Sequence, residues 1–206
     1  MYPYAGIMLE FVVGSSLAAA AGLNAWMPLF VLGVLDRLAP GFDLPGAWTW
    51  LSSDIALWVV GILLVIEIVA DKIPAVDSVN DVIQTIIRPA AGGIAFGAGT
   101  TAETITDPAQ LFSDGAWVPI AVGVVIALLV HGAKATVRPV ANLASAGLAA
   151  PALSTAEDVS SFALAVTAIL VPIVAAILLV LLIVGVVALL RRRARVRAQA
   201  RAQSAA

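Results

Sequence analysis

The fold is decided by residues 67–93, which read EIVADKIPAVDSVNDVIQTIIRPAAGG. This stretch follows an apolar run long enough to reach across a bilayer, and it leads into a second apolar run rich in alanine and glycine. Six charged residues lie within it: Glu67, Asp71, Lys72, Asp77, Asp81 and Arg88. Charged side chains at membrane depth cost several kcal/mol and tend to mark pathways or sites. The stretch therefore predicts a polar centre in an otherwise apolar protein.

The composition of the chain is that of a polytopic membrane protein. Of its 206 residues, 62% are hydrophobic and 12% are charged, and the mean hydropathy is +1.05. Soluble domains are about half apolar and about a quarter charged. We expect an all-α bundle of about six transmembrane segments, some of them broken by proline or re-entrant. Residues 1–190 would form this single domain, and residues 191–206 would form a cytoplasmic arginine-rich tail.

Several kinds of chemistry are disfavoured by what the sequence lacks. The chain has no cysteine, which excludes disulfides, thiolate metal sites and a cysteine nucleophile. Its single histidine, His131, disfavours a zinc or haem site, and we expect no cofactor or bound metal. Without a Gly-x-Ser-x-Gly motif, a phosphate loop or a pair of metal-binding histidines, an ordinary enzyme is not expected. Asp71, Asp77 and Asp81 have the carboxylates that Mg²⁺ prefers, but their spacing matches no recognised motif.

The first apolar segment, residues 7–35, is longer than a perpendicular crossing needs. Gly22, Asn24 and Pro28 lie close together in its middle. Proline removes a backbone donor and clashes with the preceding turn, so the helix is expected to kink or break here. Two interpretations remain: a tilted, kinked helix, or a broken helix whose freed backbone groups line a cavity.

Within the decisive stretch, a turn is predicted to lead into an amphipathic helix. Ser78 is expected to cap this helix, with Asp81 three residues later in a pattern like a capping box. Its apolar face consists of Val79, Val82, Ile83, Ile86 and Ile87. The pair Arg88-Pro89 is expected to end this helix and begin the next, because the residue before a proline avoids helical angles.

A second polar cluster follows the span predicted for residues 117–130. It reads HGAKATVRPVANLAS, and on a helix His131, Lys134 and Arg138 share one face. Further on, residues 154–157 (STAE) are interpreted as a capping box that begins the last long apolar run. The two clusters resemble each other, because each has a lysine and then an Arg-Pro pair. This weak repeat predicts two half-units, roughly residues 54–103 and 116–171.

The arginine-rich tail predicts the orientation of the chain in the cytoplasmic membrane of a bacterium. The tail arginines are Arg191, Arg192, Arg193, Arg195, Arg197 and Arg201. The positive-inside rule places them in the cytoplasm, where they are expected to bind anionic lipid and not nucleic acid. Six crossings with both termini inside are favoured, and five crossings remain an alternative. The uncertain point is Pro172, which either divides the apolar run 162–190 or kinks one helix.

Four segments of the sequence resemble a bacterial integral-membrane family catalogued as domain of unknown function 4126. They are GLNAWMPLFVLGVLDRL, the decisive stretch, HGAKATVRPVANLAS and STAEDV, and they occur in this order. The resemblance runs from about Ala19 to the arginine tail, and its most specific part is the ADKIP-VDS-IRP-AG pattern. It implies the architecture of that family. It brings no assigned activity.

These features lead to a functional hypothesis and two alternatives. The favoured function is a small secondary transporter or lipid flippase for an anionic substrate. Substrate binding is assigned to Arg88, Lys134, Arg138 and His131, and proton coupling to Glu67 or Asp71. Structural polar roles are assigned to Lys72, Asp77, Asp81, Glu157 and Asp158. The alternatives are a non-transporting scaffold with structural charge clusters and an intramembrane lipid-modifying enzyme, and homo-oligomer formation stays open.

Overall fold

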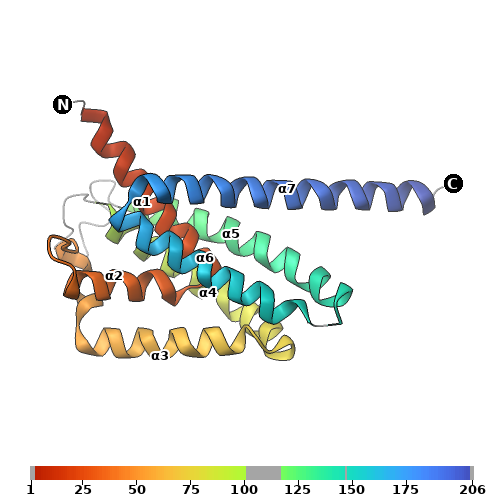
Figure 1. Ribbon diagram of the computed structural model, residues 1–206, viewed down its shortest axis with the longest axis horizontal. Helices are drawn as coiled ribbons and strands as arrows, with labels where there is room; N and C mark the ends of the chain where they lie inside the picture. The colour runs from red at the N-terminus through yellow and green to blue at the C-terminus, as the bar shows by residue number, and fades with distance from the viewer. Residues whose placement is uncertain (1–2, 101–116, 147, 205–206) are drawn as a thin grey trace.

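The computed structural model describes residues 3–100, 117–146 and 148–204, and these residues form eight helices without a strand (Figure 1). In chain order the helices are α1 (Pro3–Leu23), α2 (Trp26–Leu38), η1 (Gly46–Ser52), α3 (Asp54–Ala70), α4 (Pro74–Gly99), α5 (Trp117–Ala144), α6 (Ala149–Leu170) and α7 (Pro172–Ser204). The expected all-α fold is confirmed. Residues 104–115, whose sequence TITDPAQLFSDG is that of an acidic loop, lie outside the described residues.

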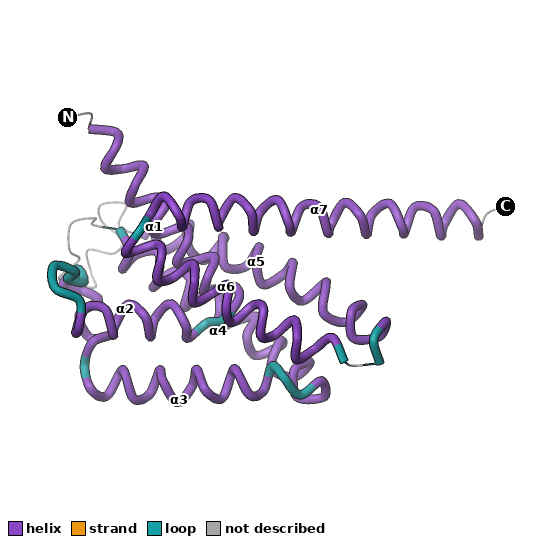
Figure 2. Tube along the Cα trace, viewed as in Figure 1, coloured by secondary structure: helices purple, strands orange, loops and turns teal. Residues whose placement is uncertain are grey.

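The helices lie mostly along one direction, and short connections join several of them (Figure 2). In Figure 1 the turn between α6 and α7 lies at the left of the view, and the turns after α3 and after α5 lie at the right. Helix α1 packs against α4, α5, α6 and α7, so it forms the centre of the bundle. Its alanine-rich segment from Leu17 to Ala21 is fully buried, because small side chains let neighbouring helices approach closely.

The first apolar segment is a broken helix, not a kinked one. Helix α1 ends at Leu23 and α2 begins at Trp26, with Asn24 and Ala25 between them. In Figure 1 the chain turns at this break and returns along α2 toward the side from which α1 came. Pro28 lies in the first turn of α2, where its missing N–H has no intrahelical partner to lose. The same proline would have interrupted a continuous helix.

Helix α3 coincides with the apolar run that leads into the decisive stretch, and two other helices have the dimensions of a membrane crossing. Among the described residues, α5 and α6 are each long and apolar enough to span a bilayer. Helix α3 and the preceding η1 would make a third span if the two, bent by 66°, are counted as one. This supports a membrane protein, but the predicted count of six crossings is not confirmed.

Helix α4 begins earlier and runs further than the sequence predicted. It starts at Pro74, whose fixed φ suits a first helical position, and the preceding Ile73 is extended as expected before a proline. Ser78 therefore lies inside the helix, and the predicted cap is wrong. Pro89 also lies inside α4, so Arg88-Pro89 does not end it. The lost backbone hydrogen bond is tolerated because tertiary packing on both sides of Pro89 holds the helix in place.

The amphipathic face of α4 is turned inside out relative to a soluble protein. Val82 and Ile86 of the apolar stripe are 72% and 78% exposed, whereas Gln84 and Arg88 are 3% and 0% exposed. Soluble proteins rarely expose large contiguous apolar patches. A lipid environment explains an arrangement in which apolar side chains point outward and polar side chains point into the bundle.

Two glycines set the close contact between α4 and α5. A Cβ atom added to Gly92 would lie 2.4 Å from the Cβ of Ala127, and one added to Gly123 would lie 2.3 Å from the carbonyl oxygen of Gly92. No side chain fits at either position, so the two backbones touch directly. Small residues after Pro89 thus allow the close helix packing that is common in lipid.

The last two helices also correct the predicted boundaries. Helix α6 begins at Ala149, so Ser154 and Glu157 lie inside it and do not form a capping box. Pro172 divides the last apolar run into two helices, with the turn at Val171. The predicted repeat is not confirmed either, because Lys72 follows the end of α3 whereas Lys134 lies in the middle of α5.

Candidate functional site

A network of buried charged side chains lies where α3, α4, α5 and α6 meet the break between α1 and α2. The most deeply buried members are Glu67, Asp71, Arg88, Lys134 and Arg138, each 5% exposed or less. Glu157, Asp158 and Lys72 complete the network at its edge. Four cations thus face four carboxylates, which balances the charge of a cluster that has left water.

Glu67 places a carboxylate at the N-terminus of α2. One oxygen accepts a hydrogen bond from Arg88 Nη2 at 2.8 Å, and the other accepts one from the backbone N–H of Ala25 at 3.1 Å. The first N–H groups of a helix have no intrahelical partner and carry partial positive charge. The carboxylate of Glu67 therefore occupies a position where the helix N-terminus and Arg88 would stabilise any anion.

Cations close the other side of the break, at the C-terminus of α1. Arg88 Nη1 donates to the carbonyl oxygen of Gly22 at 3.4 Å, and Lys134 Nζ donates to that of Leu23 at 3.2 Å. Free carbonyl groups at a helix C-terminus carry partial negative charge, so cations are stabilised there. Each half of the broken helix thus meets a buried charge of the opposite sign.

Asn24, which lies in the break, forms hydrogen bonds both to the N-terminus of α2 and to the charge network. Its Oδ1 accepts hydrogen bonds from the backbone N–H groups of Trp26 and Met27, at 3.2 and 3.1 Å. Its Nδ2 donates to Asp158 Oδ1 at 3.0 Å. The side chain caps α2 in the way that N-cap residues do, and it ties the cap to α6.

Asp71 is the centre of the network. Its Oδ2 accepts from Lys134 at 2.8 Å, from Arg138 at 3.1 Å and from Arg88 at 3.4 Å, and its Oδ1 accepts from Asn80 at 2.7 Å. Burial alone would raise the pKa of Asp71. The positive charges of Lys134, Arg138 and Arg88 outweigh burial and lower this pKa to about 2.

Helix α6 contributes the outer carboxylates. Glu157 pairs with Arg138 and, at 3.1 Å, with Lys134 Nζ. Asp158 pairs with Lys72 Nζ at 3.0 Å, and the same ammonium group donates to Ser154 Oγ at 3.4 Å. These contacts join α6 to the end of α3 and to α5.

His131 links Arg88 to the backbone of α4. Because a guanidinium group can only donate, the contact of 3.2 Å from Arg88 Nη1 makes His131 Nδ1 an acceptor. The proton of the neutral ring is then on Nε2, which lies 3.1 Å from Thr85 Oγ1. Thr85 in turn donates to the carbonyl oxygen of Asp81 at 2.9 Å.

Three buried polar atoms on the inward face of α4 have no hydrogen-bond partner among the described residues. They are Asp81 Oδ1, Gln84 Oε1 and Arg88 Nε. Buried polar groups are normally paired, and an unpaired one costs about 1–3 kcal/mol. The three residues are spaced so that they share one face of α4. Their unpaired atoms could therefore bind a further polar ligand or water beside the network.

The structure brings together all four residues assigned to substrate binding and both assigned to proton coupling. Lys72, Glu157 and Asp158, which were assigned structural roles, also pair within the network, and Asp81 lies beside it on α4. The side chain of Asp77 lies outside the described residues. In the part of the chain that the structure describes, no group of three or more histidine and carboxylate side chains is arranged to hold a metal ion.

Sequence reasoning missed Asn24, Asn80, Thr85 and Ser154 as members of the site. Asn24 had a signal, because an amide between a glycine and a proline in an apolar run marks a helix break with a cap. For the other three residues the pattern offered only local roles.

Comparisons with known proteins gave one match. A family model described as Domain of unknown function (DUF4126) matches residues 11–192, a range that includes the whole charge network. Neither a curated protein nor a solved structure matches the chain.

Proposed function

The chain belongs to the DUF4126 family, and we propose that it is a small secondary transporter for a substrate with a carboxylate or phosphate group. The observation that carries this proposal is the buried charge network at the two ends of a broken helix. Discontinuous helices whose ends face ions near the middle of the bilayer are how many transporters build their sites. Here the backbone N–H of Ala25, at the N-terminus of α2, and the guanidinium of Arg88 together form an anion-binding site.

The carboxylate of Glu67 occupies this anion-binding site when no substrate is bound. A carboxylate or phosphate of a substrate has the same charge and the same acceptor oxygens, so it competes with Glu67 for Arg88 and for the N–H of Ala25. A proton on Glu67 removes its negative charge and weakens both contacts. The substrate anion then enters with the proton, which couples the two movements.

Glu67 suits the role of proton carrier better than Asp71. Among the described residues, Glu67 forms an ion pair with Arg88, whereas Asp71 forms ion pairs with Arg88, Lys134 and Arg138. With a pKa lowered to about 2, Asp71 stays ionised at neutral pH. We assign Asp71 to holding the three cations in place while Glu67 changes its protonation state.

The proposed path through the membrane has five crossings, made by α3 to α7. In this proposal α1 and α2 form a re-entrant pair that enters and leaves on one side, because the chain turns back at Asn24 (Figure 1). The turns after α3 and α5 and the arginine tail then face the cytoplasm. The loop between α2 and α3 faces outward.

A proteoliposome assay tests this function with two probes. Uptake of radiolabelled inorganic phosphate reports a free anion, and bleaching of a fluorescent phosphatidylglycerol by an external reductant reports lipid movement. A pH dye inside the vesicles reports the coupled proton. We expect one probe to move in a manner that depends on the proton gradient, and we expect Glu67→Gln to abolish that dependence.

Arg192→Gln, which removes an exposed cation of the tail outside the network, is the matched control and should behave as the parent protein does. Arg88→Lys keeps the charge but not the forked geometry, and it should reduce the rate without loss of the folded protein. The proposal fails if neither probe moves in the parent protein, or if Glu67→Gln retains the dependence on the proton gradient.

A structural role is the second candidate, and the charge balance of the network favours it. Each of the four cations pairs with at least one carboxylate, as expected of a network that fixes helix packing. This candidate predicts that Arg88→Lys lowers the thermal unfolding midpoint while no probe moves in any variant. The transport assay therefore separates the two functions.

A further inference from the structure

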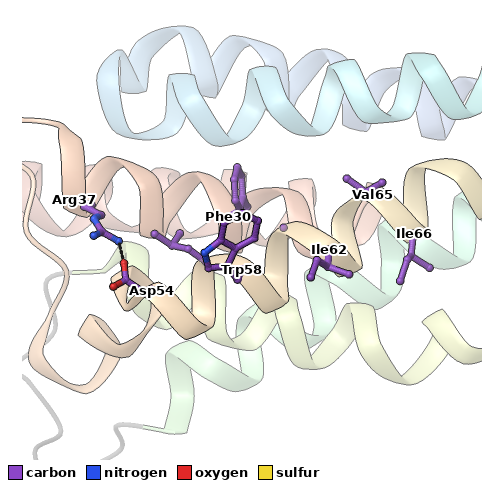
Figure 3. A pocket seen from close by; sticks show the side chains of 9 residues that line it. Phe30, Arg37, Asp54, Trp58, Ile62, Val65 and Ile66 are labelled. Atoms are coloured by element: carbon purple, nitrogen blue, oxygen red, sulfur yellow. Dashed lines mark hydrogen bonds and ion pairs between the residues drawn. The ribbon is translucent and has the colours of Figure 1, made fainter.

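An apolar groove runs between α2 and α3 on the outer surface of the bundle (Figure 3), and no residue of the charge network lines it. Its volume is about 560 Å³. Trp58, Ile62, Val65 and Ile66 line it from α3, and Phe30 faces them from α2. Arg37 and Asp54 form an ion pair at one end of this row, and Ile66 lies at the other (Figure 3).

A missing side chain keeps the groove open. Gly61 lies at its base, and a Cβ atom added there would lie 3.2 Å from the ring of Phe30. That spacing is tighter than an ordinary contact, so a larger residue at position 61 would push Phe30 or fill the groove. The groove therefore depends on a glycine in an otherwise bulky apolar helix.

The length of the groove matches one leaflet of a bilayer. Asp54 and Ile66 are twelve positions apart on α3, which is about 18 Å at 1.5 Å per residue. Half of a hydrocarbon core of about 30 Å is roughly 15 Å. A single acyl chain lying along α3 would thus run from the ion pair to the depth of the membrane centre.

The charged end of the groove offers both signs to a ligand. The side chains of Arg37 and Asp54 are 49% and 76% exposed, so their free edges face outward while they pair with each other. A guanidinium group favours a phosphate, and a carboxylate favours a primary ammonium group. Trp58 follows Asp54 by one helical turn, at the level where aromatic side chains meet lipid headgroups.

We propose that this groove is a binding site for a phospholipid whose headgroup carries a phosphate and a primary ammonium group. The phosphate meets Arg37, the ammonium group meets Asp54, and one acyl chain lies on Trp58, Ile62 and Val65 against Phe30. A purely anionic headgroup would satisfy Arg37 but would be repelled by Asp54. The site therefore selects phosphatidylethanolamine over phosphatidylglycerol.

Fluorescence quenching by brominated lipids tests the site in the full-length protein. The signal of Trp58 is the difference between the parent protein and Trp58→Phe, each reconstituted in mixed bilayers of the two lipids. Bromine is placed on the acyl chains of one lipid class at a time. We expect brominated phosphatidylethanolamine to quench Trp58 about two- to five-fold more strongly per molecule, the range of an exposed ion-pair contact.

Three variants sharpen the result. Gly61→Leu fills the groove and should abolish the difference between the two lipids. Gly185→Leu is the matched control, because the added side chain on α7 meets no neighbouring atom within 4 Å, and it should keep the difference. Asp54→Asn, at an exposed position, should shift the preference toward phosphatidylglycerol.

Equal quenching by both lipids in the parent protein would overturn the proposal, as would a preference that survives Gly61→Leu. A second copy of the chain seated in the groove would also overturn it. In that case neither brominated lipid would quench Trp58, and the protein would run as a dimer in detergent.

Discussion

Arg88 and Arg37 both pair with a carboxylate, but only Arg88 does so away from solvent. Arg88→Met leaves Glu67 as a buried charge without its cation, which costs about 3–5 kcal/mol. Arg37→Met removes an exposed ion pair, which costs about 0–1 kcal/mol. The thermal unfolding midpoints of the two variants in the same detergent measure the contrast. Similar losses for both would show that the buried network is not a source of stability.

Asp71 makes the stability of the protein depend on acid. Its pKa is lowered from 3.8 to about 2, so the folded state favours the ionised form. This contribution, on the order of 2 kcal/mol, is fully present above about pH 4 and is lost as the pH falls toward 2. The difference in unfolding free energy between the parent protein and Asp71→Asn should therefore shrink between pH 4 and pH 2. A difference that stays constant through this window would contradict the assignment of the lowered pKa.

At the level of helices, the contact between α4 and α5 depends on Gly92. Gly92→Leu drives a side chain into Ala127 and into the backbone of α5, and overpacking of this kind costs about 1–3 kcal/mol or more. Gly132→Leu is the matched control in α5, because a Cβ atom there meets nothing within 4 Å. Yield and thermal midpoint should fall for the first variant only. Equal behaviour of the two variants would mean that the helices separate to accept the side chain.

The sequence predicted the helices whose signal is local and missed the boundaries that depend on distant contacts. An uninterrupted apolar run predicted α3, and it forms as expected. Ser78 and Ser154 carry the pattern of helix caps, yet both lie inside helices. Ser154 instead accepts a hydrogen bond from Lys72, a residue 82 positions away. No local pattern encodes a partner at that distance.

The same reasoning explains how much of the candidate site was predicted. Ionisable residues in an apolar chain stand out because they are costly in lipid, so Arg88, Lys134 and Arg138 were identified from their type alone. Their common partner, Asp71, was identified for the same reason, as a carboxylate in an apolar chain. The contact of Glu67 with the N-terminus of α2 was not predicted, because it needs the chain to break at Asn24 and turn back.

For the whole molecule, the proposed path through the membrane is open to a direct test, because the chain contains no cysteine. Gly6, Thr49 and Leu148 lie at exposed positions, so a single cysteine can be introduced at each of them in turn. With a membrane-impermeant maleimide on intact cells, Gly6→Cys and Thr49→Cys should be labelled, and Leu148→Cys should be labelled only after lysis. Six crossings would instead protect Gly6→Cys, and the re-entrant pair would then be wrong.

The polar inner face of α4 also bears on how the chain enters its membrane during synthesis. When α4 leaves the ribosome, Glu67 of α3 and Asp71, which follows α3, have already been made, but Lys134 and Arg138 of α5 have not. A lone α4 would present Arg88 and Gln84 to hydrocarbon, at a cost of a few kcal/mol for the charge alone. Arg88 can pair with Glu67 as soon as α3 and α4 are made, but Asp71 gains Lys134 and Arg138 only when α5 arrives. We therefore expect α3, α4 and α5 to partition into lipid together.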